Sequence, residues 1–189
     1  MTGSIWPRVI FAMVVLSTAV LQYRLAAHLA DRQDAMRGLD RGSAAPELEA
    51  ARPDGSALRL TDLGDRVAIV SFWTTWCLPC RVEMPELAEF VETWNADPSS
   101  TKEVVFVAVN VKEQPGDVAA FTTDPVFGNV VFALDPEGEV AERWKVYGFP
   151  STFVVGPDGT VLDAVVGYDS KLAFRIRGVL KPFRAAGTR

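Results

Sequence analysis

The chain has 189 residues, of which 49% are hydrophobic and 23% charged, with a formal net charge of −5 at pH 7. This composition suits one globular domain plus a short extra segment. Because the sequence contains no internal repeat and no Lys/Arg-rich run, we expect neither a repeat architecture nor a nucleic-acid partner.

Residues 9–21 form an uncharged, almost entirely apolar stretch near the N-terminus. Thirteen helical residues span only about 20 Å, which is short of a hydrocarbon core of about 30 Å. Residues 5–27 are long enough if Arg8 and Arg24 extend their charged ends to the interfaces. A cleaved signal peptide is the alternative, but no clean Ala-x-Ala site follows. We therefore favour an uncleaved anchor within residues 1–30, and either alternative exports the domain.

Residues 31–45 are polar, contain Gly38 and Gly42 and are followed by Pro46, and they are predicted to tether the anchor to a domain of residues 46–189. About 145 residues are enough for one substantial core. Within that domain, residues 47–51 and 57–60 flank the turn signal Pro53-Asp54-Gly55-Ser56. This arrangement predicts a β-hairpin ahead of the main core.

The two cysteines of the chain, Cys77 and Cys80, follow an apolar run at residues 67–72 and precede a helical pattern at residues 81–94. The pair is therefore predicted to lie on a strand-to-helix turn. Unpaired N–H groups and the positive end of a helix dipole lower a thiol pKa from about 8.5. We expect Cys77 to be the exposed nucleophile and Cys80, one turn into the helix, to be the more buried resolving thiol.

Two other uses of the cysteine pair are disfavoured. A zinc site needs about four ligands, and the chain has only these cysteines and His28, which lies in the N-terminal apolar region. A purely structural disulfide stabilises through the loop that it closes, and a two-residue gap closes almost none. We expect redox chemistry, with no metal and no other cofactor.

The remaining pattern alternates strands with helices. The predicted strands and helices are residues 104–109 (strand), 115–121 (helix), 130–134 (strand), 139–145 (helix), 151–155 and 160–166 (hairpin) and 170–183 (helix). This order predicts an α/β fold with a central mixed sheet that is covered on both faces.

Two motifs resemble one family. The segment Trp76-Cys77-Leu78-Pro79-Cys80-Arg81-Val82-Glu83-Met84-Pro85-Glu86-Leu87 is similar to the active site of membrane-anchored thioredoxin-like proteins of the TlpA, ResA and CcmG type. Tyr147-Gly148-Phe149-Pro150-Ser151-Thr152-Phe153 resembles the cis-proline loop of that family. The resemblance covers residues 45–183 and implies a thioredoxin fold in which Cys77 and Cys80 form the redox-active disulfide.

The resemblance also implies roles for individual side chains. Glu83 matches a glutamate of ResA-like proteins, and a nearby carboxylate can relay a proton and oppose early thiolate formation; the alternative is a surface glutamate. Pro150 is expected to be cis and to leave neighbouring backbone groups free for an extended substrate. Ser71 stands where ordinary thioredoxins have a buried aspartate, and we interpret it as a small strand residue.

A set of side chains around the dithiol is expected to contact substrate. Its members are Trp76, Leu78, Pro79 and Phe149. For Phe149, core packing is an equally good alternative.

The expected function is an extracytoplasmic thiol–disulfide oxidoreductase that reduces disulfides of partner proteins. The resemblance implies apocytochrome c or copper-site assembly proteins as substrates, a membrane electron donor of the DsbD or CcdA type, and a bacterial inner-membrane location with the domain in the periplasm. One alternative is a DsbA-like oxidant, although Leu78-Pro79 lacks the usual histidine between the cysteines. A second alternative is a non-enzymatic copper chaperone of the Sco type. Its site needs Cys-x-x-x-Cys and a distant histidine, and this chain has neither feature. Thr74-x-x-Cys77 imitates a peroxiredoxin signature only in part, because Val70 replaces its proline.

Overall fold

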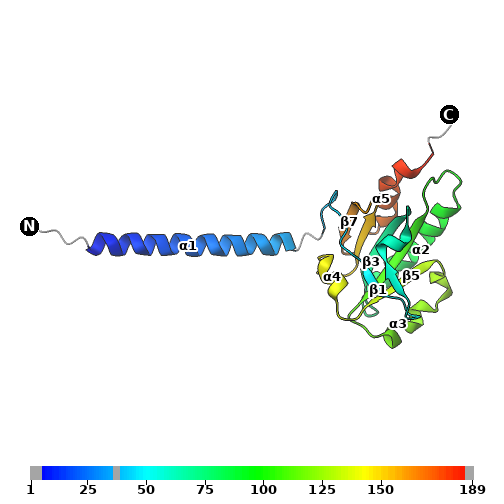
Figure 1. Ribbon diagram of the computed structural model, residues 1–189, viewed down its shortest axis with the longest axis horizontal. Helices are drawn as coiled ribbons and strands as arrows, with labels where there is room; N and C mark the ends of the chain where they lie inside the picture. The colour runs from blue at the N-terminus through cyan, green and yellow to red at the C-terminus, as the bar shows by residue number, and fades with distance from the viewer. Residues whose placement is uncertain (1–5, 36–38, 186–189) are drawn as a thin grey trace, which may run out of the picture. The chain divides into compact units, whose positions relative to one another are not determined.

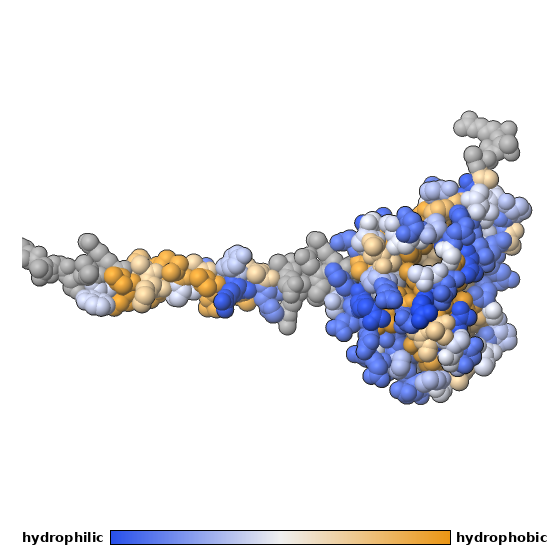
Figure 2. Space-filling model, in the orientation of Figure 1, coloured by the Kyte–Doolittle hydropathy of each residue, from blue (hydrophilic) through white to orange (hydrophobic). Residues whose placement is uncertain are grey.

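The computed structural model describes residues 6–35 and 39–185 and divides the chain into two compact units. The first unit contains the helix α1 (Trp6–Ala35) (Figure 1). Within it, Val9–His28 is the one stretch of the described chain that is long and apolar enough to cross a membrane, and none of it is buried. Twenty helical residues span about 30 Å, the thickness of a hydrocarbon core. Figure 2 shows apolar side chains along much of the visible face of α1.

The second unit is built on a seven-stranded mixed sheet with the strand order β2-β1-β5-β4-β3-β6-β7. Its strands are β1 (Glu49–Ala51), β2 (Ala57–Arg59), β3 (Val67–Trp73), β4 (Val104–Val111), β5 (Val130–Asp135), β6 (Ser151–Val155) and β7 (Val161–Val166). The central strands β3, β4 and β5 are parallel, and all other pairs are antiparallel. The predicted mixed sheet and the added hairpin β1–β2 are both present.

Helices cover both faces of this sheet, as Figure 1 shows for α2 and α4 on opposite sides of the strands. The helices of the domain are α2 (Leu78–Ala96), α3 (Pro115–Thr122), α4 (Glu139–Arg143) and α5 (Leu172–Val179), with short 3-10 turns η1 (Leu60–Leu63), η2 (Pro125–Phe127) and η3 (Lys181–Phe183).

Successive side chains of β3 enter two separate cores. Ile69 packs in the core that contains α2 and α5, whereas Val70 packs in the core that contains α4 and the β1–β2 hairpin. All seven residues of β3 and all eight of β4 are buried. Burial on both faces explains why these strands are almost entirely apolar and show no polar alternation, with Ser71 and Asn110 as their polar residues.

Several element ends differ from the prediction. Helix α2 begins at Leu78, three residues before the predicted start, because Cys77 is its N-cap and Pro79 is tolerated in a first helical turn. The predicted helix at residues 139–145 ends at Arg143, and the one at 170–183 is divided into α5 and η3. Helix α2 continues through Pro85.

The chain contacts the domain from Leu39 onward, within the segment predicted as a tether. Leu39 is buried, the Gly42 N–H donates to the carbonyl of Val161, and the Val161 N–H donates to the carbonyl of Ser43, both at 2.8 Å. Residues 42–45 therefore lie along the β6–β7 hairpin. The boundary at residues 45 and 46 stays a prediction, and the residues that precede Leu39 directly lie outside the described chain.

Candidate active site

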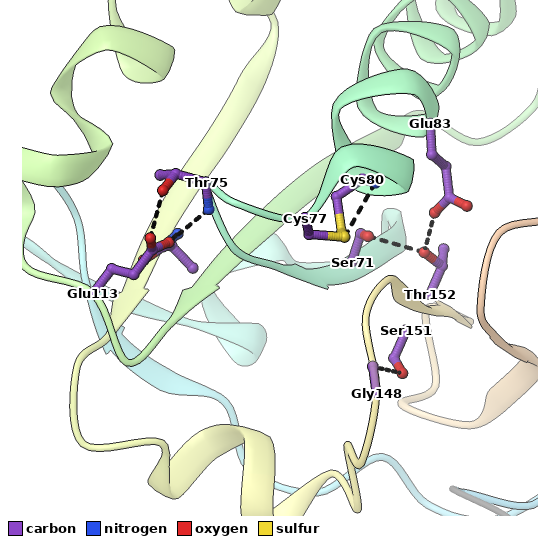
Figure 3. The surroundings of a disulfide bond; sticks show 10 residues. Ser71, Thr75, Cys77, Cys80, Glu83, Glu113, Gly148, Ser151 and Thr152 are labelled. Carbon is purple, nitrogen blue, oxygen red and sulfur yellow. Dashed lines mark hydrogen bonds between the residues drawn. A yellow bond between two sulfur atoms is a disulfide. The ribbon is translucent and has the colours of Figure 1, made fainter.

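The cysteine pair lies where β3 ends and α2 begins. The Cys77 N–H donates to the carbonyl of Thr74 at 3.2 Å, which closes the turn between the two elements. Cys77 and Cys80 form a disulfide with an S–S distance of 2.04 Å (Figure 3). The Cys80 N–H donates to Sγ of Cys77 at 3.2 Å. A peptide donor in a first helical turn therefore faces the sulfur that would become the thiolate.

The exposure of the two cysteines follows the predicted order, but the difference is small. Cys77 is 4% exposed and Cys80 is fully buried, so the expectation of an openly exposed nucleophile is wrong for the disulfide form. The S–S bond holds the Cys77 sulfur toward the helix, where it accepts the Cys80 N–H. The neighbouring Trp76 and Leu78 are each 69% exposed, and Pro79 is also exposed.

The predicted proline loop lies beside this turn. The Phe149–Pro150 peptide bond is cis, and Pro150 is buried. The rings of Trp76 and Phe149 meet edge to face with their centroids 6.0 Å apart, which joins the cysteine turn to the proline loop. Phe149 also packs against both cores, so the core-packing alternative is confirmed, and its contact with substrate stays a prediction.

Glu83 is a buried carboxyl group on α2, only 1% exposed, which rules out the surface alternative. Its Oε1 lies 2.8 Å from the Thr152 hydroxyl, and that hydroxyl lies 2.9 Å from Oγ of Ser71. In the described part of the chain, Oε2 of Glu83 has no hydrogen-bond partner. Because a hydroxyl has one proton, Thr152 donates in at most one of these two bonds.

Burial raises the pKa of Glu83 to about 7, and the carboxylates of Glu86 and Asp169 act in the same direction. The hydrogen bond with Thr152 opposes this rise. A carboxyl group with this pKa can accept or release a proton near neutral pH, which is what general acid–base chemistry requires.

Two contacts at the site were not predicted from the sequence. Ser71 is more than a small strand residue, because it faces Thr152 across the antiparallel β3–β6 pair and bonds to its hydroxyl. Glu113, which follows β4, accepts hydrogen bonds from Thr75 just before the cysteine turn. In Figure 3, Glu113 and Glu83 lie on opposite sides of the cysteine pair. The carboxyl end of parallel β4 beside that of β3 was the available signal for Glu113.

A mixed sheet, a Cys-x-x-Cys disulfide at a helix N-terminus and a cis-proline loop define a thioredoxin-like thiol–disulfide oxidoreductase. Residues 41–164, well over half of the chain, match the AhpC/TSA family. The chain belongs to this family.

Named relatives agree with the class. The chain is 30% identical over 134 residues to the thiol:disulfide interchange protein CycY of Rhizobium leguminosarum bv. viciae, which covers 71% of this chain and 68% of that protein. It is 29% identical over 151 residues to the thiol-disulfide oxidoreductase ResA of Bacillus subtilis, with 79% and 80% covered. A crystal structure of a putative thiol:disulfide interchange protein DsbE from Chlorobium tepidum superposes with a TM-score of 0.65 at 29% identity, covering 75% of this chain and 99% of that one. The predicted fold and enzyme class are confirmed.

Proposed function

We propose that this oxidoreductase works as a reductant of disulfides in partner proteins on the extracytoplasmic side of a bacterial inner membrane. The observation that carries the proposal is the Cys77 sulfur at the N-cap of α2, which accepts the Cys80 N–H beside the cis-proline loop. A thiolate is stabilised at such a position, and the thiolate is the attacking species in disulfide exchange.

The reaction would begin from the reduced dithiol. The Cys77 thiolate attacks one sulfur of the partner disulfide, and the partner's other sulfur leaves as a thiolate that takes up a proton. Cys80 then loses its proton and attacks the Cys77 sulfur, which breaks the mixed disulfide and releases the second partner thiol. Two electrons pass to the partner, and the protein ends with the Cys77–Cys80 disulfide.

Glu83 is proposed as the group that takes the proton from Cys80. Glu83 stands one helical turn after Cys80, and its pKa of about 7 allows it to accept a proton and return it near neutral pH. The dithiol and Glu83 would then titrate as a coupled set. Removal of the carboxylate would therefore change the apparent pKa values of both thiols.

The exposed side chains around the disulfide are proposed to contact the partner. Trp76, Leu78 and Pro79 are exposed on the cysteine turn, and Phe149 holds Trp76 from the proline loop. An apolar rim of this kind suits the unfolded or extended segment in which an accessible disulfide occurs.

The physiological partners are proposed from the family resemblance. Apocytochrome c and copper-site assembly proteins would be the substrates, and a membrane protein of the DsbD or CcdA type would return electrons to the Cys77–Cys80 disulfide. Helix α1 would hold the protein in the inner membrane with the domain in the periplasm.

Trapping of the mixed disulfide tests the mechanism. Cys80→Ser leaves the attacking thiol in place and removes the resolving one, so we expect a covalent adduct with the partner, which mass spectrometry of the extracytoplasmic fraction identifies. Cys77→Ser, the matched control, should form none. Adducts that form through Cys80 in the Cys77→Ser protein, and not in the reverse case, contradict the assignment.

The direction of electron flow separates the reductant from an oxidant. Equilibration of the dithiol with glutathione gives its reduction potential, and a value of about −250 mV or lower supports the reductant, whereas about −120 mV identifies an oxidant.

The AhpC/TSA match makes peroxide reduction the second candidate. Thr74, the threonine of the partial peroxiredoxin signature, is buried, and its hydroxyl has no hydrogen-bond partner among the described residues. The proline of that signature is missing, because Val70 occupies its position inside β3. Consumption of hydrogen peroxide by the reduced protein, faster than by the Cys77→Ser variant, would favour this second function.

A further inference from the structure

Glu113 follows β4 at the sheet edge where the cysteine turn begins. Strands β3 and β4 are parallel, and their register pairs Trp73 with Asn110. The residues that follow each strand therefore meet at one edge of the sheet, and Thr75 and Glu113 are among them. In Figure 3 the carboxylate of Glu113 points at Thr75, next to the cysteine pair.

The backbone turns sharply just before Glu113. Lys112 has φ +57°, a left-handed conformation that a non-glycine residue rarely adopts, and its N–H donates to the carbonyl of Asp135 at 2.9 Å. Strained backbone of this kind persists only where the surrounding structure holds it, and it occurs often at functional sites. At this turn the chain leaves the direction of β4, which ends at Val111, and Glu113 comes to lie beside the cysteine turn.

Three donors converge on the Glu113 carboxylate. The Thr75 N–H donates to Oε2 at 2.7 Å, and the Thr75 hydroxyl donates to Oε1 at 2.5 Å. The side-chain amide of Asn110 donates to Oε2 at 2.7 Å. Both carboxylate oxygens are therefore engaged, and Thr75 is held through its backbone and its side chain at once.

The hold on Thr75 reaches the reactive sulfur through two short steps. Thr75 lies within the turn that the hydrogen bond from the Cys77 N–H to the Thr74 carbonyl closes. Cys77 in turn begins α2 and places its sulfur against the Cys80 N–H. A shift at Thr75 would therefore move the Cys77 sulfur relative to Cys80, with which it forms the disulfide.

We propose that Glu113 is a positioning residue, which fixes the Thr75 peptide and thereby biases the Cys77–Cys80 pair toward the disulfide. This inference deepens the proposed oxidoreductase function and rests on it. The three hydrogen bonds hold the turn in the geometry in which Cys77 and Cys80 form the disulfide. Stabilising the disulfide relative to the dithiol makes the protein a stronger reductant.

The test is the equilibrium with glutathione. In it, two glutathione molecules reduce the Cys77–Cys80 disulfide to the dithiol and are themselves oxidised to glutathione disulfide. For Glu113→Gln, which keeps the side-chain length, we expect the equilibrium to move at least about threefold toward the dithiol, or about 14 mV less reducing. For Thr75→Val, which removes the hydroxyl and keeps the N–H and the carboxylate, we expect a smaller shift of the same sign.

Asp97→Asn is the matched control. Asp97 also accepts from a backbone N–H at 2.9 Å and a hydroxyl at 2.7 Å, both of Ser99, but it lies beyond the other end of α2. We expect Asp97→Asn to lower the melting temperature without moving the glutathione equilibrium.

If Glu113→Gln lowers the melting temperature and leaves the equilibrium where the wild type has it, Glu113 only stabilises the loop and the inference is overturned. The equilibrium is measured without any partner protein. A shift in Glu113→Gln would therefore support the positioning role even if no protein disulfide proved to be a substrate.

Discussion

The raised pKa of the buried Glu83 carboxyl group affects both the proton transfer that we propose and the stability of the protein. Burial raises its pKa from 4.5 to about 7, so the native protein keeps this proton over a pH range in which the unfolded chain loses it. This retained proton is the one that we propose Glu83 exchanges with Cys80. Burial without an ion-pair partner is a recurrent feature of carboxyl groups that act as acids or bases.

The first prediction at this scale concerns stability against pH. Because the native state binds the Glu83 proton more tightly than the unfolded state, the free energy of unfolding should fall as pH rises from about 4.5 to about 7 and level off above, by about 3 kcal/mol in all. Glu83→Gln removes this contribution. Denaturant titrations measure the free energy of unfolding. For the variant, this free energy should equal that of the oxidised wild type near pH 4.5 and exceed it near pH 8.

Glu92→Gln on the exposed surface of α2 is the control for that experiment, and its difference from the wild type should not vary with pH in this way. Parallel stability curves for the wild type and Glu83→Gln would show that Glu83 is ionised in the native protein near neutral pH.

The residue scale also shows where sequence reasoning stops. Both cysteines, Pro150 and Glu83 lie in short local motifs, so they could be singled out from the sequence. The bonds from Thr152 to Glu83 and from Thr75 to Glu113 join residues 69 and 38 positions apart. No local pattern marks such a pair, because the partner of each side chain is fixed by strand register and by the turn at Lys112.

At the scale of elements, the segment before β1 is joined to the end of the sheet through Asp163. This buried residue of β7 accepts from Nε of Arg175 on α5 at 2.6 Å and from Nε of Arg41 at 2.6 Å. Burial alone would raise the pKa of Asp163, but the hydrogen bonds from Arg175 and Arg41 hold it below its ordinary value. The pair of arginines thus joins three segments at one carboxylate.

Asp163→Asn should destabilise the domain by about 1–3 kcal/mol at neutral pH, because the three hydrogen bonds from Arg41 and Arg175 lose the negative charge and one of the two acceptor oxygens. Since the native pKa is lowered, the contribution of Asp163 is present above the ordinary value of 3.8 and is lost as pH falls below it. The difference between variant and wild type in denaturant titrations should therefore shrink in acid.

Asp65→Asn provides the comparison. Its ion pair with Lys102 lies at the surface, with Asp65 83% exposed, and such pairs contribute less than about 1 kcal/mol. Equal losses for Asp163→Asn and Asp65→Asn would mean that the Asp163 contacts do not hold the segment.

Strands were easier to predict than helix ends, for a physical reason. Strands β3, β4 and β6 are buried on both faces and consist mostly of apolar and β-branched residues, so their composition alone marks them. The ends of α2, α4 and α5 depend on capping and on the chain reversal that follows. In addition, the docking of residues 39–45 depends on Arg41 and Asp163, which are 122 positions apart.

At the scale of the whole molecule, the chain combines one apolar helix with one redox domain. The described part of α1 exposes large apolar side chains along its length, which are Trp6, Val9, Ile10, Phe11, Met13, Val14, Val15, Leu16, Val20, Leu21 and Leu25. Exposed apolar surface on this scale is unfavourable in water and favourable in a hydrocarbon core. We therefore propose that α1 serves as an uncleaved anchor, as the sequence predicted.

Membrane extraction tests this proposal. If Val9–His28 spans the membrane, the protein should stay in the membrane fraction after high-salt and carbonate washes, because apolar burial does not weaken with ionic strength. N-terminal sequencing should find Met1 or Thr2. Replacing both Ala19 and Val20 with arginine should release the protein or block its insertion, since each arginine costs about 3 kcal/mol near a helix centre. Ala19→Leu should behave as the wild type, whereas a soluble wild-type product beginning near Asp31 would identify the helix as a signal peptide.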